Sequence, residues 1–169
     1  MGSGSSGRYS GTKGGSQPFS ETYHVVSSEM NKDKKDPDIY NPETGYFKNP
    51  TAIDLNDSIQ NNRIYVDGKK QTGTITYVMD KDGKIIIGIR KNPNNPNKRS
   101  PHPTLIGGKD PIVQCAGMIT FNKGRISSVN TNSGHYRPNS KSLSKVINAL
   151  QKLCDKNPDL FSPNSEWRK

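Results

Sequence analysis

Apolar residues are scarce in this sequence, and they form no long run. They make up 28% of the 169 residues, and the mean hydropathy is −0.91. This share is too small to build a packed core from the whole chain. Every apolar run falls far short of the roughly 18–20 residues that a transmembrane helix needs. Residues 1–7 are almost entirely Gly and Ser, with no apolar segment behind them. We therefore expect no membrane partner and no signal peptide.

Cysteine is also scarce. Cys115 and Cys154 are the only two, and they form neither a CxxC pair nor a zinc-ligand spacing with the three histidines. This pattern predicts two reduced and mostly buried thiols, with a single disulfide as the alternative. A catalytic thiol at Cys115 is disfavoured, because this residue falls within a strand pattern where burial makes a thiol inert.

Acidic residues are few in the second half of the chain. Residues 1–80 carry a net charge of −1, whereas residues 81–169 carry 16 Lys and Arg against 5 Asp and Glu. Asp110 is the only acid between Asp82 and Asp155. Because a Mg²⁺ site needs carboxylates, a metal nuclease is disfavoured, and we expect neither a metal nor another cofactor. The positive charge favours a nucleic acid, a nucleotide or an acidic protein as partner, unless it serves only solubility.

The chain length fits one domain with a tail. Residues 1–18 are rich in Gly, Ser and Thr and have no apolar period, which is typical of a flexible linker or a tag. Residues 19–169 are expected to form a single domain. Short helices are expected within 22–35 and 51–59.

Alternating apolar residues and tight turns predict most of the remaining elements. Strands are expected at 63–66, 73–79, 84–90, 113–121 and 125–129. A helix with one apolar face should run to about residue 156, capped by Ser140 or Ser142. The expected fold class is α+β, an antiparallel sheet of about five strands with this C-terminal helix packed on one face.

Two polar segments carry the residues suited to chemistry. The first, residues 101–108, lies in a long connection rich in Pro and Asn, and such loops are usually functional or disordered. His102 stands between two prolines, and Gly107 and Gly108 allow a sharp turn or a close approach to a ligand. The alternative is that His102 caps a strand end.

The second segment, residues 133–138, lies between a strand and the last helix. Such loops favour sites because helix N-termini attract anions. His135, Tyr136 and Arg137 supply a group that titrates near neutral pH, a phenol and a fixed cation. The alternative is a hydrogen-bonded corner in which Tyr136 packs and Arg137 pairs with an acid.

Two histidines that meet at one phosphate can act as general base and general acid in metal-independent RNA cleavage. We therefore predict that the imidazoles of His102 and His135 lie within about 10 Å of each other, each replaceable by alanine with thermal unfolding nearly unchanged. The expected catalytic residues are His102, His135, Tyr136 and Arg137. The expected substrate-binding residues are Lys98, Arg99, Thr104, Gly107, Gly108, Lys109 and Ser133.

Several strings between His102 and Leu143 resemble one known domain. They are His102-Pro-Thr-Leu-Ile-Gly-Gly, Ala116-Gly117, Gly124-Arg125-Ile126, Ser133-Gly-His-Tyr-Arg-Pro138 and Ser142-Leu143. This pattern is similar to the C-terminal domain of plant IQ-motif calmodulin-binding proteins, which also occurs at the C-terminal tips of bacterial polymorphic toxins. The resemblance covers about a quarter of the chain.

The sequence departs from this pattern at three places. Pro101-His102 stands where the plant proteins have two histidines, and Cys115 stands where they have alanine. The IQ motif is absent, so no calmodulin binding is expected.

The resemblance implies a toxic effector domain with a cognate immunity protein. It would be secreted as part of a larger protein and act in the cytoplasm of a target cell. No reaction follows from the resemblance, so three function classes stay open. The first is a ribonuclease using His102 and His135 on RNA. The second is an NAD-consuming toxin, an ADP-ribosyltransferase or NAD glycohydrolase, for which the late acid Glu166 lies close to the C-terminus. The third is a binding module without catalysis.

Overall fold

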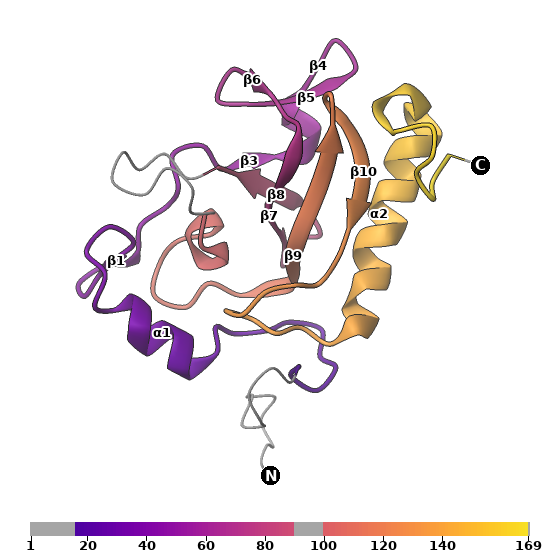
Figure 1. The fold of residues 1–169 in the computed structure, drawn as a ribbon. Coiled ribbons are helices and arrows are strands. Elements are labelled where there is room, and N and C mark those ends of the chain that lie inside the picture. The colour runs from indigo at the N-terminus through magenta and orange to yellow at the C-terminus, as the bar shows by residue number, and fades with distance from the viewer. Residues whose placement is uncertain (1–15, 90–99, 169) are drawn as a thin grey trace.

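A five-stranded antiparallel sheet forms the centre of the molecule (Figure 1). The computed structural model describes residues 16–89 and 100–168. The strands follow the spatial order β10-β9-β7-β8-β3. Their bounds are β3 Ile53–Asp54, β7 Gly73–Asp80, β8 Ile85–Gly88, β9 Val113–Asn122 and β10 Arg125–Val129. The predicted α+β class with an antiparallel sheet is confirmed.

The predicted turns join these strands. Between β7 and β8, the Asp80 carboxylate accepts hydrogen bonds from the backbone N–H groups of Asp82 and Lys84, both at 2.9 Å. Between β9 and β10, Lys123 and Gly124 adopt φ angles of 51° and 84°. Short polar side chains and glycine suit such turns, so the local sequence already determined them.

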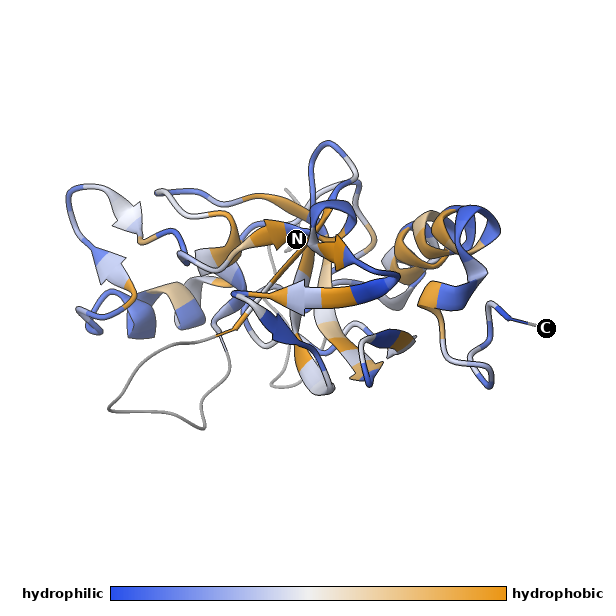
Figure 2. Ribbon diagram, turned by 90° about the horizontal axis from the view of Figure 1, so that it is seen from above, coloured by the Kyte–Doolittle hydropathy of each residue, from blue (hydrophilic) through white to orange (hydrophobic). Residues whose placement is uncertain are grey.

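Helix α2 (Leu143–Lys156) covers one face of the sheet, as predicted. Val146, Leu150 and Cys154 are buried in a core shared with Tyr77 and Ile119 of the central strands. Figure 2 shows hydrophobic residues in the central strands and on α2. The helix begins where the sequence predicts it. Ser142 is the N-cap residue, as predicted, but its side chain makes no capping hydrogen bond, whereas Asn139 accepts the Lys141 N–H at the 3₁₀ turn η4 (Ser140–Ser142) just before the helix.

The opposite face of the sheet carries a second core. There, Val78 and Ala116 pack with Leu105, Tyr46 and Tyr136. This face is covered by α1 (Ser27–Asp33), the hairpin of β1 (Tyr40–Asn41) and β2 (Gly45–Tyr46), and the 3₁₀ turn η3 (His102–Leu105). In Figure 1 these elements lie on the far side of the sheet from α2. Both polar segments singled out in the sequence therefore belong to the face opposite α2.

Residues 51–70 depart most from expectation. The segment predicted as a helix within 51–59 instead forms β3, the 3₁₀ turn η2 (Leu55–Ser58) and β4 (Ile59–Gln60). The strand β5 (Arg63–Val66) does not join the main sheet, because it pairs with β4 and β6 (Lys69–Lys70). Short helices are marginal on their own, so pairing of Ile53 with Ile87 at the sheet edge decides the structure here.

Of the linker expected over residues 1–18, the structure describes only residues 16–18. Gln17, within the expected linker, is 2% exposed and donates a hydrogen bond to the carbonyl of Tyr136. The packed domain therefore begins before residue 19. The helix expected within 22–35 is reduced to α1, because Tyr23 pairs with Val113 instead.

At the C-terminal end, α2 is followed by the 3₁₀ turn η5 (Pro158–Leu160). None of the helices described has the length and apolar character needed to cross a membrane.

Candidate functional site

His102 is buried, and one of its ring nitrogens is hydrogen-bonded to the sheet. It opens η3, its residue is 6% exposed, and its Nε2 lies 2.8 Å from the carbonyl oxygen of Gly117 in the middle of β9. Because a carbonyl only accepts, Nε2 carries the proton and Nδ1 of the neutral ring keeps its lone pair. The ring contacts the middle of a strand and does not cap a strand end.

Burial sets the protonation state of His102. Desolvation lowers its pKa to about 4, with a smaller opposing effect from the Gly117 hydrogen bond and a further lowering by His135. At neutral pH the ring is therefore uncharged, with Nδ1 as a hydrogen-bond acceptor.

His135 lies beside His102. Their ring centroids are 6.5 Å apart, and the ring planes are inclined by 49°. The loop is closed by Ser133, whose hydroxyl accepts the N–H of Tyr136 and whose carbonyl accepts the N–H of Arg137. The predicted proximity of the two imidazoles is confirmed.

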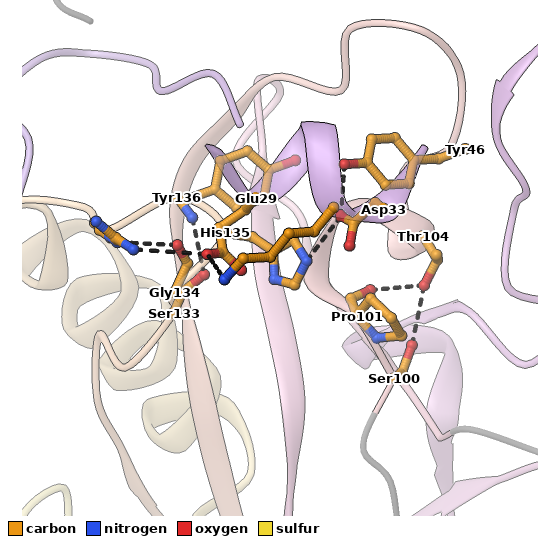
Figure 3. A network of polar contacts seen from close by, with 12 residues as sticks. Glu29, Asp33, Tyr46, Ser100, Pro101, Thr104, Ser133, Gly134, His135 and Tyr136 are labelled. Carbon is orange, nitrogen blue, oxygen red and sulfur yellow. Dashed lines mark hydrogen bonds and ion pairs between the residues drawn. The ribbon is translucent and has the colours of Figure 1, made fainter. Parts of the chain in front are cut away.

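Helix α1 supplies a partner for His135. Asp33 Oδ2 lies 2.9 Å from His135 Nε2 and accepts a 2.7 Å hydrogen bond from the Tyr46 hydroxyl. Figure 3 shows Asp33 between these two rings. The two atoms lie within ion-pair distance, and His135 Nε2 has no hydrogen-bond partner among the described residues. The side chains of His135 and Asp33 are 19% and 11% exposed, so this pair is largely shielded from water.

Tyr46 stays protonated and fixes the carboxylate. Burial raises the pKa of Tyr46 well above its ordinary value, and its hydrogen bond to Asp33 and the negative charge there raise it further. A phenol in this state is a permanent donor to Asp33. Tyr46 thus holds a carboxylate in place beside the His135 ring.

The other two residues predicted as catalytic are engaged elsewhere. Tyr136 is fully buried, its hydroxyl donates to the carbonyl of Pro111 at 2.9 Å, and burial raises its pKa well above the ordinary value. Arg137 donates from Nε to the carbonyl of Gly134 and lies 3.7 Å from a Glu29 carboxylate oxygen. Both contacts match the hydrogen-bonded corner considered as the alternative.

The hydroxyls predicted to bind substrate have structural partners. Thr104 is buried and donates to the carbonyl of Pro101 at 2.6 Å, which holds the turn of η3 together. Ser133 is buried and accepts the Tyr136 N–H. Lys109 is exposed next to this region. Lys98 and Arg99 lie outside the described residues.

The glycine pair serves a backbone contact. Gly107 and Gly108 have φ angles of 82° and 89°. Gly108 exchanges two backbone hydrogen bonds with Tyr46, at 2.8 and 2.9 Å. A Cβ at Gly45 would lie 2.3 Å from the carbonyl of Gly108. The close approach that these glycines allow is therefore made by β2, which carries Tyr46 to Asp33.

Asp33, Glu29 and Tyr46 were not predicted from the sequence. Asp33 stands in the run Asn31-Lys-Asp-Lys-Lys35, which has the composition of a solvated helix end and gives no signal of a site. The chain carries few acids near the two histidines, whereas Asp33 and Glu29 come from α1, about a hundred residues away in sequence. Among the described residues, no three Asp, Glu, His or Cys side chains gather closely enough to hold a metal ion.

The remaining histidine and the cysteines lie outside this cluster. His24 is exposed and pairs with Asp110 at 2.8 Å. Cys115 and Cys154 are free and buried, as predicted. Burial raises the pKa of the Cys115 thiol, which makes it a poor nucleophile at neutral pH.

The chain matches no protein-family model, no curated protein and no solved structure. The geometry of the two histidines and their partners is therefore the basis for a functional proposal.

Acid should destabilise the protein through His102. Above pH 6.5 its ring is neutral in both states, whereas between pH 6.5 and 4 the unfolded chain binds a proton that the folded protein excludes. The free energy of unfolding should therefore fall as the pH is lowered through this window, by about 3 kcal/mol at most. Urea unfolding at pH 7 and at pH 4.5 measures the loss.

The variant His102→Gln retains an N–H donor for Gly117 and cannot titrate, so it should lose most of this pH dependence. The variant His24→Gln serves as the matched control, because His24 is half exposed. An equal pH dependence in wild type and His102→Gln would contradict the assignment.

Proposed function

We propose that this domain cleaves RNA without a metal ion, using His102 and His135 as an acid–base pair. The observation that carries the proposal is the 6.5 Å separation of the two ring centroids. A general acid or base must come within about 2.6–3.2 Å of the atom it serves, or reach it through one water. Two rings this close can serve two oxygens of the same phosphate group.

The reaction assigns opposite roles to the two rings. The neutral His102 accepts the proton of the ribose 2′-hydroxyl at Nδ1, and the 2′ oxygen attacks the phosphorus. The bond from phosphorus to the 5′ oxygen breaks as His135, protonated on both nitrogens, gives its Nδ1 proton to that oxygen. The products are a 2′,3′-cyclic phosphate and a 5′-hydroxyl. His102 has gained one proton and His135 has lost one.

Asp33 supports the role of His135. It faces Nε2 at 2.9 Å, which leaves Nδ1 as the atom that exchanges a proton with the substrate. When the ring is protonated, it can form an ion pair with this carboxylate, which Tyr46 holds from its other side. Such orientation by a third group is typical of catalytic histidines.

The biological setting follows from the motif resemblance. In this proposal the chain is the effector domain of a secreted bacterial polymorphic toxin. It acts on RNA in the cytoplasm of a target cell and is neutralised by a cognate immunity protein. The net charge of +11 over residues 81–169 suits a polyanionic substrate.

The position of Glu166 favours RNA over NAD as the substrate. Glu166 is exposed in the C-terminal segment, next to Trp167, which packs in the core on the α2 side of the sheet. The histidine pair lies on the opposite side, with the core that contains Tyr136. An acid in that position is poorly placed to join His135 at a dinucleotide.

Incubation of the purified domain with total RNA and, separately, with NAD tests the proposal. We expect RNA fragments with 2′,3′-cyclic phosphate ends in the presence of EDTA, and intact NAD. A DNA oligonucleotide with one internal ribonucleotide should be cut only after that ribonucleotide, because attack requires its 2′-hydroxyl. Loss of NAD without loss of RNA would select an NAD-consuming toxin, and loss of neither would favour a binding module.

A further inference from the structure

A polar hollow lies at the end of the sheet where β9 turns into β10. Its volume is about 350 Å³, and four cationic side chains line it: Arg63, Lys70, Lys123 and Arg125. We call it the basic pocket. Asn122 lines the basic pocket, and Gly117 accepts the hydrogen bond from His102. These two residues are five positions apart on β9, which corresponds to about 17 Å at the usual rise of a strand.

Backbone contacts bring these cations together. The turn between β9 and β10 is hydrogen-bonded to the segment that carries β5 and β6. Ile64 N donates to Gly124 O at 2.8 Å, and Gly124 N donates to Gln71 O at 2.7 Å. A Cβ at Gly124 would lie 2.8 Å from Arg63 Cβ and 3.0 Å from Lys70 Cγ. Figure 1 shows β5 and β6 beside this turn. The cations therefore converge through a fixed framework.

The basic pocket contains more cationic side chains than nearby carboxylates. Asp159 accepts hydrogen bonds from Arg63 at 3.2 Å and from Arg125 at 3.1 Å, and its side chain is 52% exposed. Within the described residues, no carboxylate pairs with Lys70 or Lys123. One carboxylate thus faces four cations.

Arg125, which lines this pocket, has one nitrogen without a hydrogen-bond partner among the described residues. This nitrogen is Nε, which is buried. An unsatisfied buried donor is unfavourable. Guanidinium groups match the oxygens of phosphate in both geometry and charge.

The walls of the basic pocket argue against a protein partner. Protein interfaces depend on aromatic or aliphatic anchors. The large apolar side chains that are exposed among the described residues are Phe19 and Phe47, and neither lines this pocket. No aromatic ring lines it either, so it lacks a platform on which bases could stack.

We infer that the basic pocket binds the phosphate backbone of single-stranded RNA, independently of base sequence. The choice of RNA rests on the proposed function. The pocket is a binding site outside the histidine cluster, and it engages a part of the strand that lies away from the phosphate being cleaved. A substrate of several nucleotides is needed to reach both places, so a dinucleotide would use the histidines alone.

Binding of a fluorescent 20-nucleotide RNA to the full chain tests the inference. The measurement is fluorescence anisotropy between 50 and 200 mM salt, in a His135→Ala background that prevents turnover. The double variant Lys70→Ala/Lys123→Ala should lower the slope of log K against log salt by about 1.4, or about 0.7 per lost contact. If the affinities converge at 1 M salt, this is a loss of about 25-fold at 0.1 M.

The double variant Lys81→Ala/Lys84→Ala is the matched control. It removes the same charge from two exposed lysines of the β7–β8 turn, so its salt slope should stay close to that of the background protein. Equal slopes in the two double variants would overturn the inference. Displacement of the RNA by polyglutamate as readily as by polyphosphate would also overturn it, in favour of an acidic protein partner.

The inference and the proposed function fail in distinguishable ways. If wild type cleaves no RNA but binding still depends on Lys70 and Lys123, the pocket stands and the ribonuclease mechanism falls. If wild type cleaves RNA and the pocket variant binds and cleaves long RNA normally, the mechanism stands and the pocket falls. With histidines intact, the Lys70→Ala/Lys123→Ala variant should cleave a dinucleotide at the wild-type rate and long RNA more slowly at low concentration.

Discussion

Replacing His135 with alanine is expected to slow RNA cleavage by about 10²- to 10⁴-fold, the usual contribution of one general acid. The wild-type ring lies 6.5 Å from that of His102, and its removal leaves the departing 5′ oxygen without a proton donor. Initial rates on a fluorescent RNA oligonucleotide, at saturating substrate, measure the effect. The basic pocket is untouched by this change, so RNA binding should persist while cleavage is lost.

His24→Ala is the matched control for this variant. It removes the third histidine of the chain, which is exposed and pairs with Asp110, and it should keep the wild-type rate. Equal slowing by His24→Ala and His135→Ala would show that the effect is nonspecific. A His135→Ala protein with full activity would end the acid–base mechanism.

His102 needs a different substitution. The expectation that alanine would leave thermal unfolding nearly unchanged does not suit a residue that is 6% exposed and bonded to the Gly117 carbonyl. Truncation would leave that buried acceptor unsatisfied, at a cost of about 1–3 kcal/mol. His102→Gln retains a donor and removes the base, so it should slow cleavage while the protein remains folded. Combining it with His135→Ala should slow cleavage little further, because groups that act as a unit are not additive.

Replacing Gly45 with alanine is expected to lower the free energy of unfolding by about 2–5 kcal/mol. The backbone φ angle of +88° is strained for any residue with a Cβ. The new Cβ would also lie 2.3 Å from the backbone of Gly108, which cannot move aside as a flexible side chain would. Urea unfolding followed by tryptophan fluorescence measures the change.

Gly68→Ala separates the two contributions. Gly68 has a similar φ angle of +76°, but nothing lies within 4 Å of the Cβ position. Only the backbone strain of about 1–2 kcal/mol should appear there. Gly45→Ala should also slow RNA cleavage, because β2 carries Tyr46 to Asp33, whereas Gly68→Ala should not. An equal loss of stability in both variants would show that the contact with Gly108 contributes little.

The sequence by itself determined the parts of this protein that depend on local pattern. The alternation in residues 73–90 and 113–129 predicted β7 to β10, and the spacing of Val146, Leu150 and Cys154 predicted the buried face of α2. Turn residues such as Asp80 and Gly83 predicted the hairpins. Periodicity and turn chemistry act over a few residues, so they can be seen without knowing the fold. The same holds for the two buried thiols, which follow from strand and helix patterns.

Only part of the candidate site could be predicted from the sequence. The strings around His102 and His135 singled out both rings and predicted that they meet. They could not show that the Tyr136 hydroxyl donates to the carbonyl of Pro111, or that Thr104 donates to the carbonyl of Pro101. These contacts depend on how the side chains are buried in the folded protein. Gly107 and Gly108 suggested a ligand, but the chain that approaches them is β2.

Only the tertiary structure decided which distant segments complete the site and the sheet. Asp33 reaches His135 across about a hundred residues of chain, and nothing in its lysine-rich surroundings marks it. Ile53 joins the main sheet, whereas β5, which has the stronger strand pattern, pairs with β4 and β6. In each case several partners are compatible with the local sequence. The choice among them depends on which arrangement buries apolar surface and satisfies backbone hydrogen bonds throughout the domain.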